Sequence, residues 1–263
     1  MKAIYNTIGD NYNFTRKADD FILHRFYQHI TKGRSVTGPH LDIGCGTGNY
    51  TIPLAQKGLS FIGVDPSEKM ILEAQAKSKD IDWRLGQAEQ IPLADAAVDT
   101  VIAQLTIHHW QNLEAGFREI HRVLRPNGRF VLFTSSPQQM QGYWLNHYFP
   151  KMMADSIQQM PALPLIEATL EKTSLQLIEK DPYAIRDDLK DLFLYAGKNR
   201  PELYFQDEVR SGISSFAALA NRAEVERGLV KLQRDIEEGR FAALQESYRH
   251  EAGDYLFIIA KSK

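Results

Sequence analysis

The chain has 263 residues, 43% of them hydrophobic, which is enough for one large α/β domain carrying a small cap. Its formal net charge of −2 gives no overall attraction to nucleic acids or anionic membranes, so we expect neither as a partner. No apolar run reaches the roughly 18 residues of a membrane span, and no signal-type apolar core follows the first residues, which predicts a cytoplasmic protein. The single cysteine, Cys45, excludes an internal disulfide bond and a thiolate metal cluster.

Residues 1–37 have the spacing of an amphipathic packing helix, with apolar side chains at Phe21, Ile22, Phe26 and Ile30. Tyr12 and Arg16 lie upstream of these side chains and are four residues apart, so a helical segment would place both on one face. Gly38 and Pro39 then form a turn into the first strand.

A glycine-rich turn within residues 41–50 connects this first buried strand to a helix. Gly44, Gly46 and Gly48 permit positive φ angles and leave no Cβ between a ligand and the backbone. The N-terminus of the following helix favours a carboxylate or a phosphate at the same place. The stretch therefore predicts a cradle for a nucleotide-like cofactor.

The second strand, residues 60–65, ends in an acid. Asp65 follows Gly44 by 21 residues, the spacing at which a carboxylate accepts hydrogen bonds from both ribose hydroxyls of a bound nucleotide. Pro66 and Ser67 open the next helix, and Ser67 is expected chiefly to be its N-cap.

Three more strands are predicted at residues 81–85, 98–103 and 129–133, with a helix after Asn112. The repeated βαβ order predicts a parallel sheet covered on both faces. Residues 104–110 follow the fourth strand and would lie at the carboxyl edge of the sheet, where open α/β sheets bind their ligands.

Four stretches in this order resemble the motifs of class I S-adenosylmethionine (SAM)-dependent methyltransferases, closest to the small-molecule (methyltransferase type 11) enzymes of ubiquinone and menaquinone biosynthesis. They are residues 42–48, 63–67, 87–93 and 119–128. The resemblance covers roughly residues 38–134. It implies a Rossmann-like sheet of seven strands with the last one antiparallel, and SAM as cofactor.

The resemblance also implies a set of cofactor contacts. Asp42 would support the amino group, Asp65 would hold the ribose, and Met70 would pack on the adenine. Relatives often have an aspartate in place of Gln87, so the adenine amine would be bound here by Gln87 or by Glu89. The full set implied for the cofactor is Tyr12, Arg16, Asp42, Gly44, Cys45, Gly46, Gly48, Asp65, Pro66, Ser67, Met70, Gln87, Ala88, Glu89 and Gln104.

The glycine spacing favours SAM over a dinucleotide, because a GxGxG turn replaces the GxGxxG that packs around a pyrophosphate. Two alternatives stay open: an NAD(P)-dependent oxidoreductase or epimerase, and a non-catalytic SAM-binding module. Methyl transfer is an in-line displacement that needs alignment and, for some acceptors, a base. His108 and His109 are the candidate bases, with one of them facing the pocket. No acid cluster follows the fourth strand, so no metal is expected.

The chain beyond residue 134 departs from the family. A sixth strand is predicted at residues 173–179, a helix after Asp187, a longer helix ending at Gly239, and a seventh strand at residues 255–260. We expect a SAM-binding core of residues 1–134, 173–180 and 254–263, and a helical cap of residues 135–172 and 181–253. The candidate substrate-binding side chains lie in that cap and are Trp144, Tyr148, Arg186 and Arg210. The expected partner is a small-molecule methyl acceptor, which the sequence does not identify.

Overall fold

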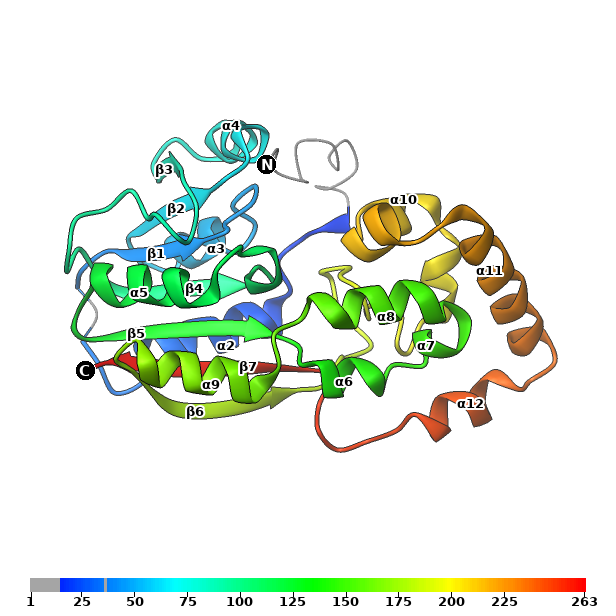
Figure 1. Cartoon of the computed structure of the whole chain (residues 1–263). Helices are drawn as coiled ribbons and strands as arrows, with labels where there is room; N and C mark the ends of the chain where they lie inside the picture. Colours follow the sequence, from blue (N-terminus) through cyan, green and yellow to red (C-terminus); the bar gives the residue numbers. More distant parts are fainter. Residues whose placement is uncertain (1–14, 36) are drawn as a thin grey trace.

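The computed structural model describes residues 15–35 and 37–263. Their centre is a seven-stranded sheet of order β3-β2-β1-β4-β5-β7-β6, seen at the left of Figure 1. The strands are β1 (His40–Ile43), β2 (Phe61–Asp65), β3 (Asp82–Leu85), β4 (Val98–Gln104), β5 (Leu124–Thr134), β6 (Leu175–Tyr183) and β7 (Tyr255–Ser262). Only β7 runs antiparallel to its neighbours, which confirms the predicted α/β fold.

The strand order reverses next to β1, and this reversal positions the site. The chain proceeds outward from β1 to β2 and β3, then returns to place β4 on the other side of β1, so that Asp42 pairs with Gly63 and with Ile102. Connections leaving the carboxyl ends of β1 and β4 therefore diverge. In open α/β sheets such a switch point leaves the crevice in which ligands bind.

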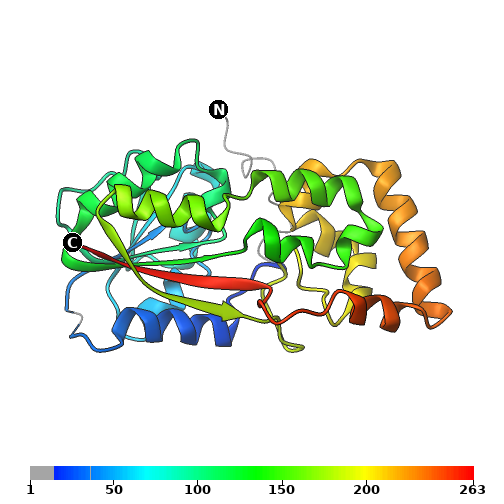
Figure 2. The same cartoon turned by 60° about the horizontal axis from the view of Figure 1, so that its bottom comes forward.

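Helices cover both faces of the sheet, as Figure 2 shows with α2 on one side and α5 and α9 on the other. The helices of the sheet layers are α2 (Asp20–Thr31), α3 (Thr51–Gln56), α4 (Glu68–Lys77), α5 (Leu113–Val123) and α9 (Leu163–Lys172). On the α2 face, Phe26 packs edge-on against Phe257, with 5.1 Å between ring centroids. On the other face, Phe117 of α5 packs on Phe130 of β5 at 5.5 Å.

A second group of helices lies beyond the carboxyl edge of β4 and β5, at the right of Figure 1. It comprises α6 (Pro137–Gln141), α7 (Leu145–Tyr148), α8 (Pro150–Gln159), η3 (Pro201–Phe205), α10 (Asp207–Ser211), η4 (Ser215–Leu219), α11 (Arg222–Glu237) and α12 (Phe241–Ser247). We call this group the helical region. Helix α9 lies within the segment 135–172 that was expected in the cap, yet it contacts α5 and β6 and covers the sheet.

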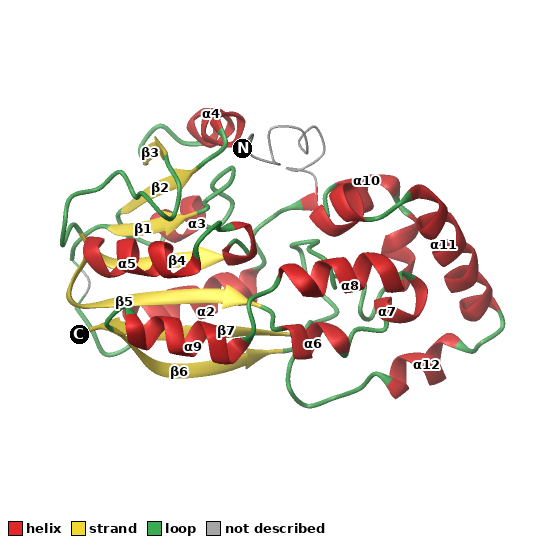
Figure 3. Ribbon diagram, in the orientation of Figure 1, coloured by secondary structure: helices red, strands yellow, loops and turns green. Residues whose placement is uncertain are grey.

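The helix expected after Asp187 is absent, and this prediction was wrong. Residues 184–200 form turns and loop, drawn green between the sheet and the helical region in Figure 3. Their backbone donors use distant partners: Ile185 N–H donates to the Asp254 carboxylate (2.7 Å), and Leu192 N–H donates to the Thr15 carbonyl (2.9 Å). Tertiary burial of apolar side chains such as Phe193 thus overrides the helical spacing.

Candidate functional site

Three cavities lie at the carboxyl edge of the sheet. The first, which we call the turn cavity, is lined by Arg16, Gly44, Gly46, Asp65, Pro66, Met70, Gln104, Leu105, Thr106 and His109. The second, the small cavity, is lined by Arg16, Asp42, Gly44, Cys45, Asn49, Tyr50, Gln104 and Asp191. Because both are lined by Arg16, Gly44 and Gln104, they form neighbouring parts of one site.

The glycine turn has the backbone geometry that its sequence predicts. Gly44, Gly46 and Gly48 have φ angles of +77°, +55° and +78°. A Cβ on Gly44 would lie 2.4 Å from the Thr106 hydroxyl oxygen, so this glycine lets the turn approach the segment after β4. A Cβ on Gly48 would lie 2.5 Å from the Trp83 ring, so Gly48 makes room for a packed side chain.

Asp65 is held by the turn it faces. One carboxylate oxygen accepts the Gly46 N–H (2.9 Å) and the other accepts the Ser67 N–H (2.8 Å). Burial raises the pKa of this carboxyl group. Each oxygen has a second lone pair, so Asp65 can still accept two hydroxyl hydrogen bonds from a diol in the turn cavity.

Asp42 is buried at the end of β1 and lines the small cavity. The Thr51 hydroxyl donates a hydrogen bond to it (2.6 Å). Burial raises the pKa of Asp42 to about 7; the Thr51 hydrogen bond opposes this rise, and the nearby Asp65 adds to it. A cation in the small cavity would stabilise the charged form of Asp42.

Of the residues after β2, Ser67 caps a helix, whereas Pro66 and Met70 line the turn cavity. The Ser67 hydroxyl caps α4 by accepting the Met70 N–H (3.3 Å), as expected for an N-cap. Pro66 and Met70 line the turn cavity, where the Met70 thioether can pack on a flat ring.

Residues 87–89, expected near the adenine, lie outside the lining of the described cavities. Gln87 is exposed and bridges to Gln90, while Ala88 is packed in the core. The Glu89 carboxylate accepts the N–H groups of Gln111 (2.6 Å) and Asn112 (3.1 Å). Its oxygens thus satisfy the backbone ahead of α5.

Arg16 lies between the cavities, whereas Tyr12 lies outside the described residues. The Arg16 guanidinium pairs with Asp191 (Nε to Oδ1, 2.5 Å). The backbone carbonyl of Arg16 accepts a hydrogen bond from the Asn49 side-chain amide (2.5 Å), which connects Arg16 to the residue after the glycine turn. Arg16 is therefore positioned at the small cavity by both its backbone and its side chain.

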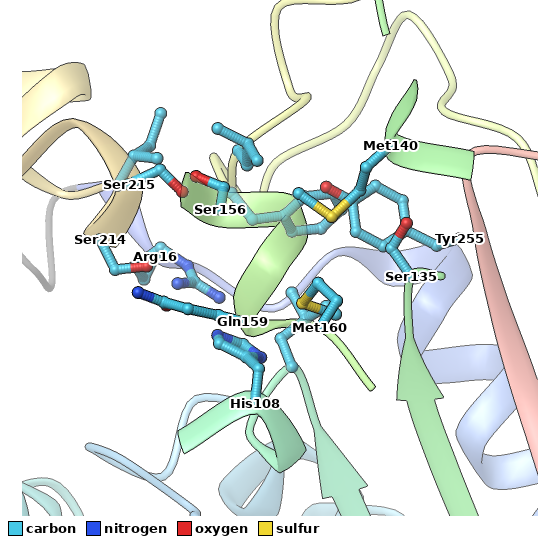
Figure 4. A pocket seen from close by; sticks show the side chains of 14 residues that line it. Arg16, His108, Ser135, Met140, Ser156, Gln159, Met160, Ser214, Ser215 and Tyr255 are labelled. Carbon is cyan, nitrogen blue, oxygen red and sulfur yellow. The ribbon is translucent and has the colours of Figure 1, made fainter. Parts of the chain in front are cut away.

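The third cavity lies between the sheet edge and the helical region, and we call it the cap cavity. It is partly open to solvent. In Figure 4, Arg16, Gln159 and Ser214 lie at one end near His108, while Ser135, Met140 and Tyr255 lie at the other. The rest of the lining is Leu105, Ser156, Met160, Phe193, Leu194, Ile213 and Ser215.

The two histidines after β4 face different cavities. His108 lines the cap cavity and His109 the turn cavity, with 4.0 Å between their ring centroids. Burial lowers the pKa of His109 to about 4. Burial, helped by His109 and Arg16, lowers the pKa of His108 well below its usual value. His108 Nδ1 is buried and has no protein hydrogen-bond partner among the described residues.

Leu105 separates the turn cavity from the cap cavity, since it lines both. Its φ is +48°, a left-handed conformation that costs a non-glycine residue about 1 kcal/mol or more. Such conformations persist where the surroundings fix them, and they gather at functional sites.

The four side chains expected to bind substrate lie elsewhere. Trp144 and Tyr148 are buried within the helical region, where Trp144 Nε1 donates to the Lys198 carbonyl (3.0 Å) and the Tyr148 hydroxyl to Asp235 (3.1 Å). Arg186 is exposed and pairs with Asp188 (3.1 Å). Arg210 pairs with Asp207 and donates to the Tyr204 carbonyl. Packing and local pairing account for all four.

Sequence reasoning missed several lining residues. Leu105 and Thr106 belong to the predicted exit of the fourth strand, so their place at the carboxyl edge could have selected them. Asn49 and Tyr50 directly follow the glycine turn. Asp191 had no such signal, because it lies in a loop that the apolar spacing had assigned to a helix.

The residues present fit SAM. The glycine turn exposes backbone, Asp65 offers two acceptors to a ribose, and Met70 offers an apolar surface to a base. Asp42, Asp191 and Arg16 supply both signs of charge to the small cavity, as the zwitterionic end of an amino acid requires. The described residues contain no group of three or more His, Cys, Asp or Glu side chains placed to hold a metal ion. None of the described helices is long and apolar enough to cross a membrane.

Comparison with known proteins agrees with this geometry. The family described as "Methyltransferase domain" matches residues 41–132. The ubiquinone/menaquinone biosynthesis C-methyltransferase UbiE of Rubrivivax gelatinosus is 31% identical over 153 residues, which cover 57% of this chain and 60% of that protein. The chain thus spans less than two thirds of that curated relative.

Solved structures extend the match to nearly the whole chain. A putative methyltransferase from an antibiotic biosynthesis pathway of Anabaena variabilis is 35% identical, with a TM-score of 0.83, and the match covers 95% of this chain and 99% of that one. The geranyl diphosphate C-methyltransferase of Streptomyces coelicolor shares the fold at 16% identity and a TM-score of 0.57, covering 92% of this chain and 80% of its own. Because the Anabaena variabilis methyltransferase is 35% identical and is covered over 99% of its length, the chain belongs to the class I SAM-dependent methyltransferases.

Proposed function

We propose that the chain transfers the methyl group of SAM to a small organic acceptor bound in the cap cavity. The observation that carries this proposal is that the turn cavity and the cap cavity share Arg16 and Leu105 in their linings. A donor in one cavity and an acceptor in the other would meet at this boundary.

SAM supplies a methyl group that is already activated by the positive charge on its sulfur. The chain then has to hold both molecules in line and exclude water. Asp65 and the glycine turn would fix the adenosyl part, and the partly buried Leu105 would lie at the boundary between the donor and the cap cavity.

The acceptor would be selected by the helical region together with Ser135, which directly follows β5. Of the described residues that line the cap cavity, none carries a carboxylate, and six are apolar: Leu105, Met140, Met160, Phe193, Leu194 and Ile213. Such a lining suits a largely apolar acceptor without positive charge. We accordingly propose that residues 135–162 and 184–253 form the cap, with α9 assigned to the SAM-binding core.

His108 would orient the acceptor more than remove a proton from it. Its lowered pKa keeps the imidazole neutral at pH 7, so one ring nitrogen can accept a hydrogen bond from an acceptor hydroxyl. The same low pKa makes it a weak base. His109, which lines the turn cavity, is the poorer candidate for contact with the acceptor.

The experiment combines binding with turnover. Calorimetry should show binding of SAM and S-adenosylhomocysteine but not of NAD. Labelled SAM should then transfer its methyl group to at least one member of a panel of phenolic, enolic and carboxylic acceptors. Binding of NAD alone would overturn the proposal in favour of an oxidoreductase or epimerase. Binding of SAM without transfer to any acceptor would favour a non-catalytic module.

The role of His108 has its own test. His108→Ala should leave the Kd for S-adenosylhomocysteine within about twofold of the wild type, because His108 does not line the turn cavity. We expect methyl transfer to fall about tenfold, the scale of one lost orienting hydrogen bond of about 1.4 kcal/mol. An equal loss of cofactor affinity would contradict the placement of His108 on the acceptor side.

A further inference from the structure

We propose that Asp191 binds the α-amino group at the methionyl end of SAM, in the small cavity. Asp191 is carried by the loop between β6 and η3, far in sequence from the glycine turn. The inference rests on the proposed function for the identity of the cofactor, and it adds a ligand contact contributed by the part of the chain that departs from the family motifs.

The Asp191 carboxylate is buried, with 1% of the residue exposed, and several donors converge on it. Arg16 Nε donates to Oδ1 (2.5 Å). The Tyr50 hydroxyl (3.2 Å) and the Gln104 side-chain amide (3.1 Å) donate to Oδ2. These three donors all line the small cavity, so the carboxylate is fixed at the wall of that cavity.

The charges around the small cavity match an amino acid zwitterion. Asp42 and Asp191 supply two carboxyl groups and Arg16 supplies one guanidinium. An ammonium group would be stabilised by the carboxylates, and a carboxylate would be stabilised by the guanidinium. A ligand phosphate would meet repulsion from both acids, which distinguishes this wall from a dinucleotide site.

Asp191 also has the capacity for a further donor. A carboxylate offers about four lone-pair positions, and the bonds described above place only Arg16 Nε on Oδ1. Oδ1 therefore has acceptor capacity left for an ammonium group while Tyr50 and Gln104 keep their bonds to Oδ2.

The loop is held across the small cavity by the N-terminal segment. Leu192 N–H donates to the Thr15 carbonyl (2.9 Å), and Lys190 N–H donates to the Asp19 carboxylate (3.2 Å). Asp19 N–H in turn donates to the Tyr50 hydroxyl (3.1 Å). Bonds on both sides of Asp191 thus fix its position relative to the glycine turn.

The test compares two ligands that differ at the methionyl end. S-adenosylhomocysteine has the amino acid group, whereas 5′-methylthioadenosine has the same nucleoside without it. Calorimetry on Asp191→Asn should show S-adenosylhomocysteine binding weakened about tenfold or more, the scale of a lost charge-assisted hydrogen bond. Binding of 5′-methylthioadenosine should change less than about threefold.

Asp65→Asn is the matched control, because Asp65 faces the ribose that both ligands share. It should weaken both ligands to a similar degree. Equal weakening of both ligands by Asp191→Asn would overturn the inference and assign Asp191 a structural role, and unchanged binding of both would also overturn it. If the wild type binds neither ligand, the proposed function fails.

A second variant covers the case in which Asp191→Asn does not fold, since that change leaves the Arg16 charge without its buried partner. Arg16→Gln/Asp191→Asn removes both charges together, which is less destabilising than breaking the pair. Circular dichroism checks its folding. The comparison is with Arg16→Gln alone, because both variants lack the guanidinium. The inference expects the affinity for S-adenosylhomocysteine relative to that for 5′-methylthioadenosine to be about tenfold or more lower in the double variant than in Arg16→Gln; an equal ratio in the two variants would contradict it.

Discussion

Burial sets the pKa of Asp42, one of the acids that line the small cavity. Asp42 has a pKa of about 7 because it is buried at the end of β1, although Thr51 donates a hydrogen bond to it. A bound ammonium group would favour the charged form and lower this pKa. Cofactor binding below pH 7 must then release a proton from Asp42.

We expect the affinity for S-adenosylhomocysteine to fall as pH falls from 8 to 6, approaching about tenfold per pH unit below the pKa of free Asp42. The sign follows because the protonated carboxyl group, favoured at low pH, binds a cation poorly. Calorimetry across this range measures the slope. Asp42→Asn should flatten it, and a variant with the wild-type slope would assign the titration to another group.

Replacing Gly48 with alanine tests whether this glycine is needed for packing against Trp83. Gly48→Ala would place a Cβ 2.5 Å from the Trp83 ring at a φ of +78°. We expect it to lower the free energy of unfolding by about 2–4 kcal/mol, combining left-handed backbone strain with overpacking.

The matched control for this change is Gly239→Ala, which has a φ of +73° and no atom within 4 Å of the added Cβ. It should cost only the backbone term, about 1 kcal/mol. Urea unfolding compares the two variants, and equal losses would rule out a packing role against Trp83.

At the scale of elements, periodicity and turn chemistry predicted the sheet well. The second, third and fourth strands and the helix ending near Gly239 lie within a few residues of their expected places, because alternating or continuous apolar runs are bounded there by glycine, proline or acids. The helix predicted within residues 184–200 does not form, because backbone N–H groups there donate to partners distant in sequence, which no local pattern reveals. Local spacing is a weaker signal than burial in a segment that fills space between two layers.

Helix α8 depends on a side chain from α11. The buried Glu224 carboxylate accepts the N–H groups of Lys151 (2.7 Å) and Met152 (3.2 Å) in the first turn of α8. Glu224→Ala leaves these donors without their partner, and we expect a loss of about 1–3 kcal/mol in the free energy of unfolding. Glu226→Ala on the exposed face of α11 should cost less than about 0.5 kcal/mol, and thermal or urea unfolding of both variants checks the difference.

For the molecule as a whole, we expect the buried His40 to make the folded state less stable in acid. His40 is fully buried at the start of β1, neither ring nitrogen has a partner among the described residues, and burial lowers its pKa to about 4. Asp99 opposes this lowering and Arg34 adds to it. The folded pKa lies below the unfolded value of 6.5, so the unfolded state binds a proton at His40 more readily than the folded state does. The free energy of unfolding is therefore highest above pH 6.5 and decreases as pH falls toward 4.

We expect His40 to account for about 2 kcal/mol of stability lost between pH 7 and pH 5. His40→Phe should remove that part of the pH dependence while keeping a ring against Phe61. Urea unfolding at the two pH values measures it, with His24→Gln as an exposed control that should behave as the wild type does. A His40→Phe protein as acid-sensitive as the wild type would refute this assignment.

The site could be predicted only in its cofactor half. The glycine turn, Asp65 and Met70 follow one another within a short stretch, so their spacing carries the geometry. The cap cavity is assembled from α6, α8, η4, the start of β7 and the loop after β6, which no sequence spacing relates. Trp144 and Tyr148 were expected there because aromatic residues line pockets, but the same apolar character places them in the interior of the helical region.

The separate origin of the two halves bears on how this protein can diversify. Apart from Arg16, Leu105 and His108, the lining of the cap cavity comes from residues 135–255. If the cap cavity binds the acceptor as we propose, recombination or loop exchange within 135–162 and 184–253 would change acceptor preference and leave the glycine turn and Asp65 as they are. The Arg16–Asp191 pair crosses this boundary, so a viable graft has to carry an acid at position 191 along with its new cavity.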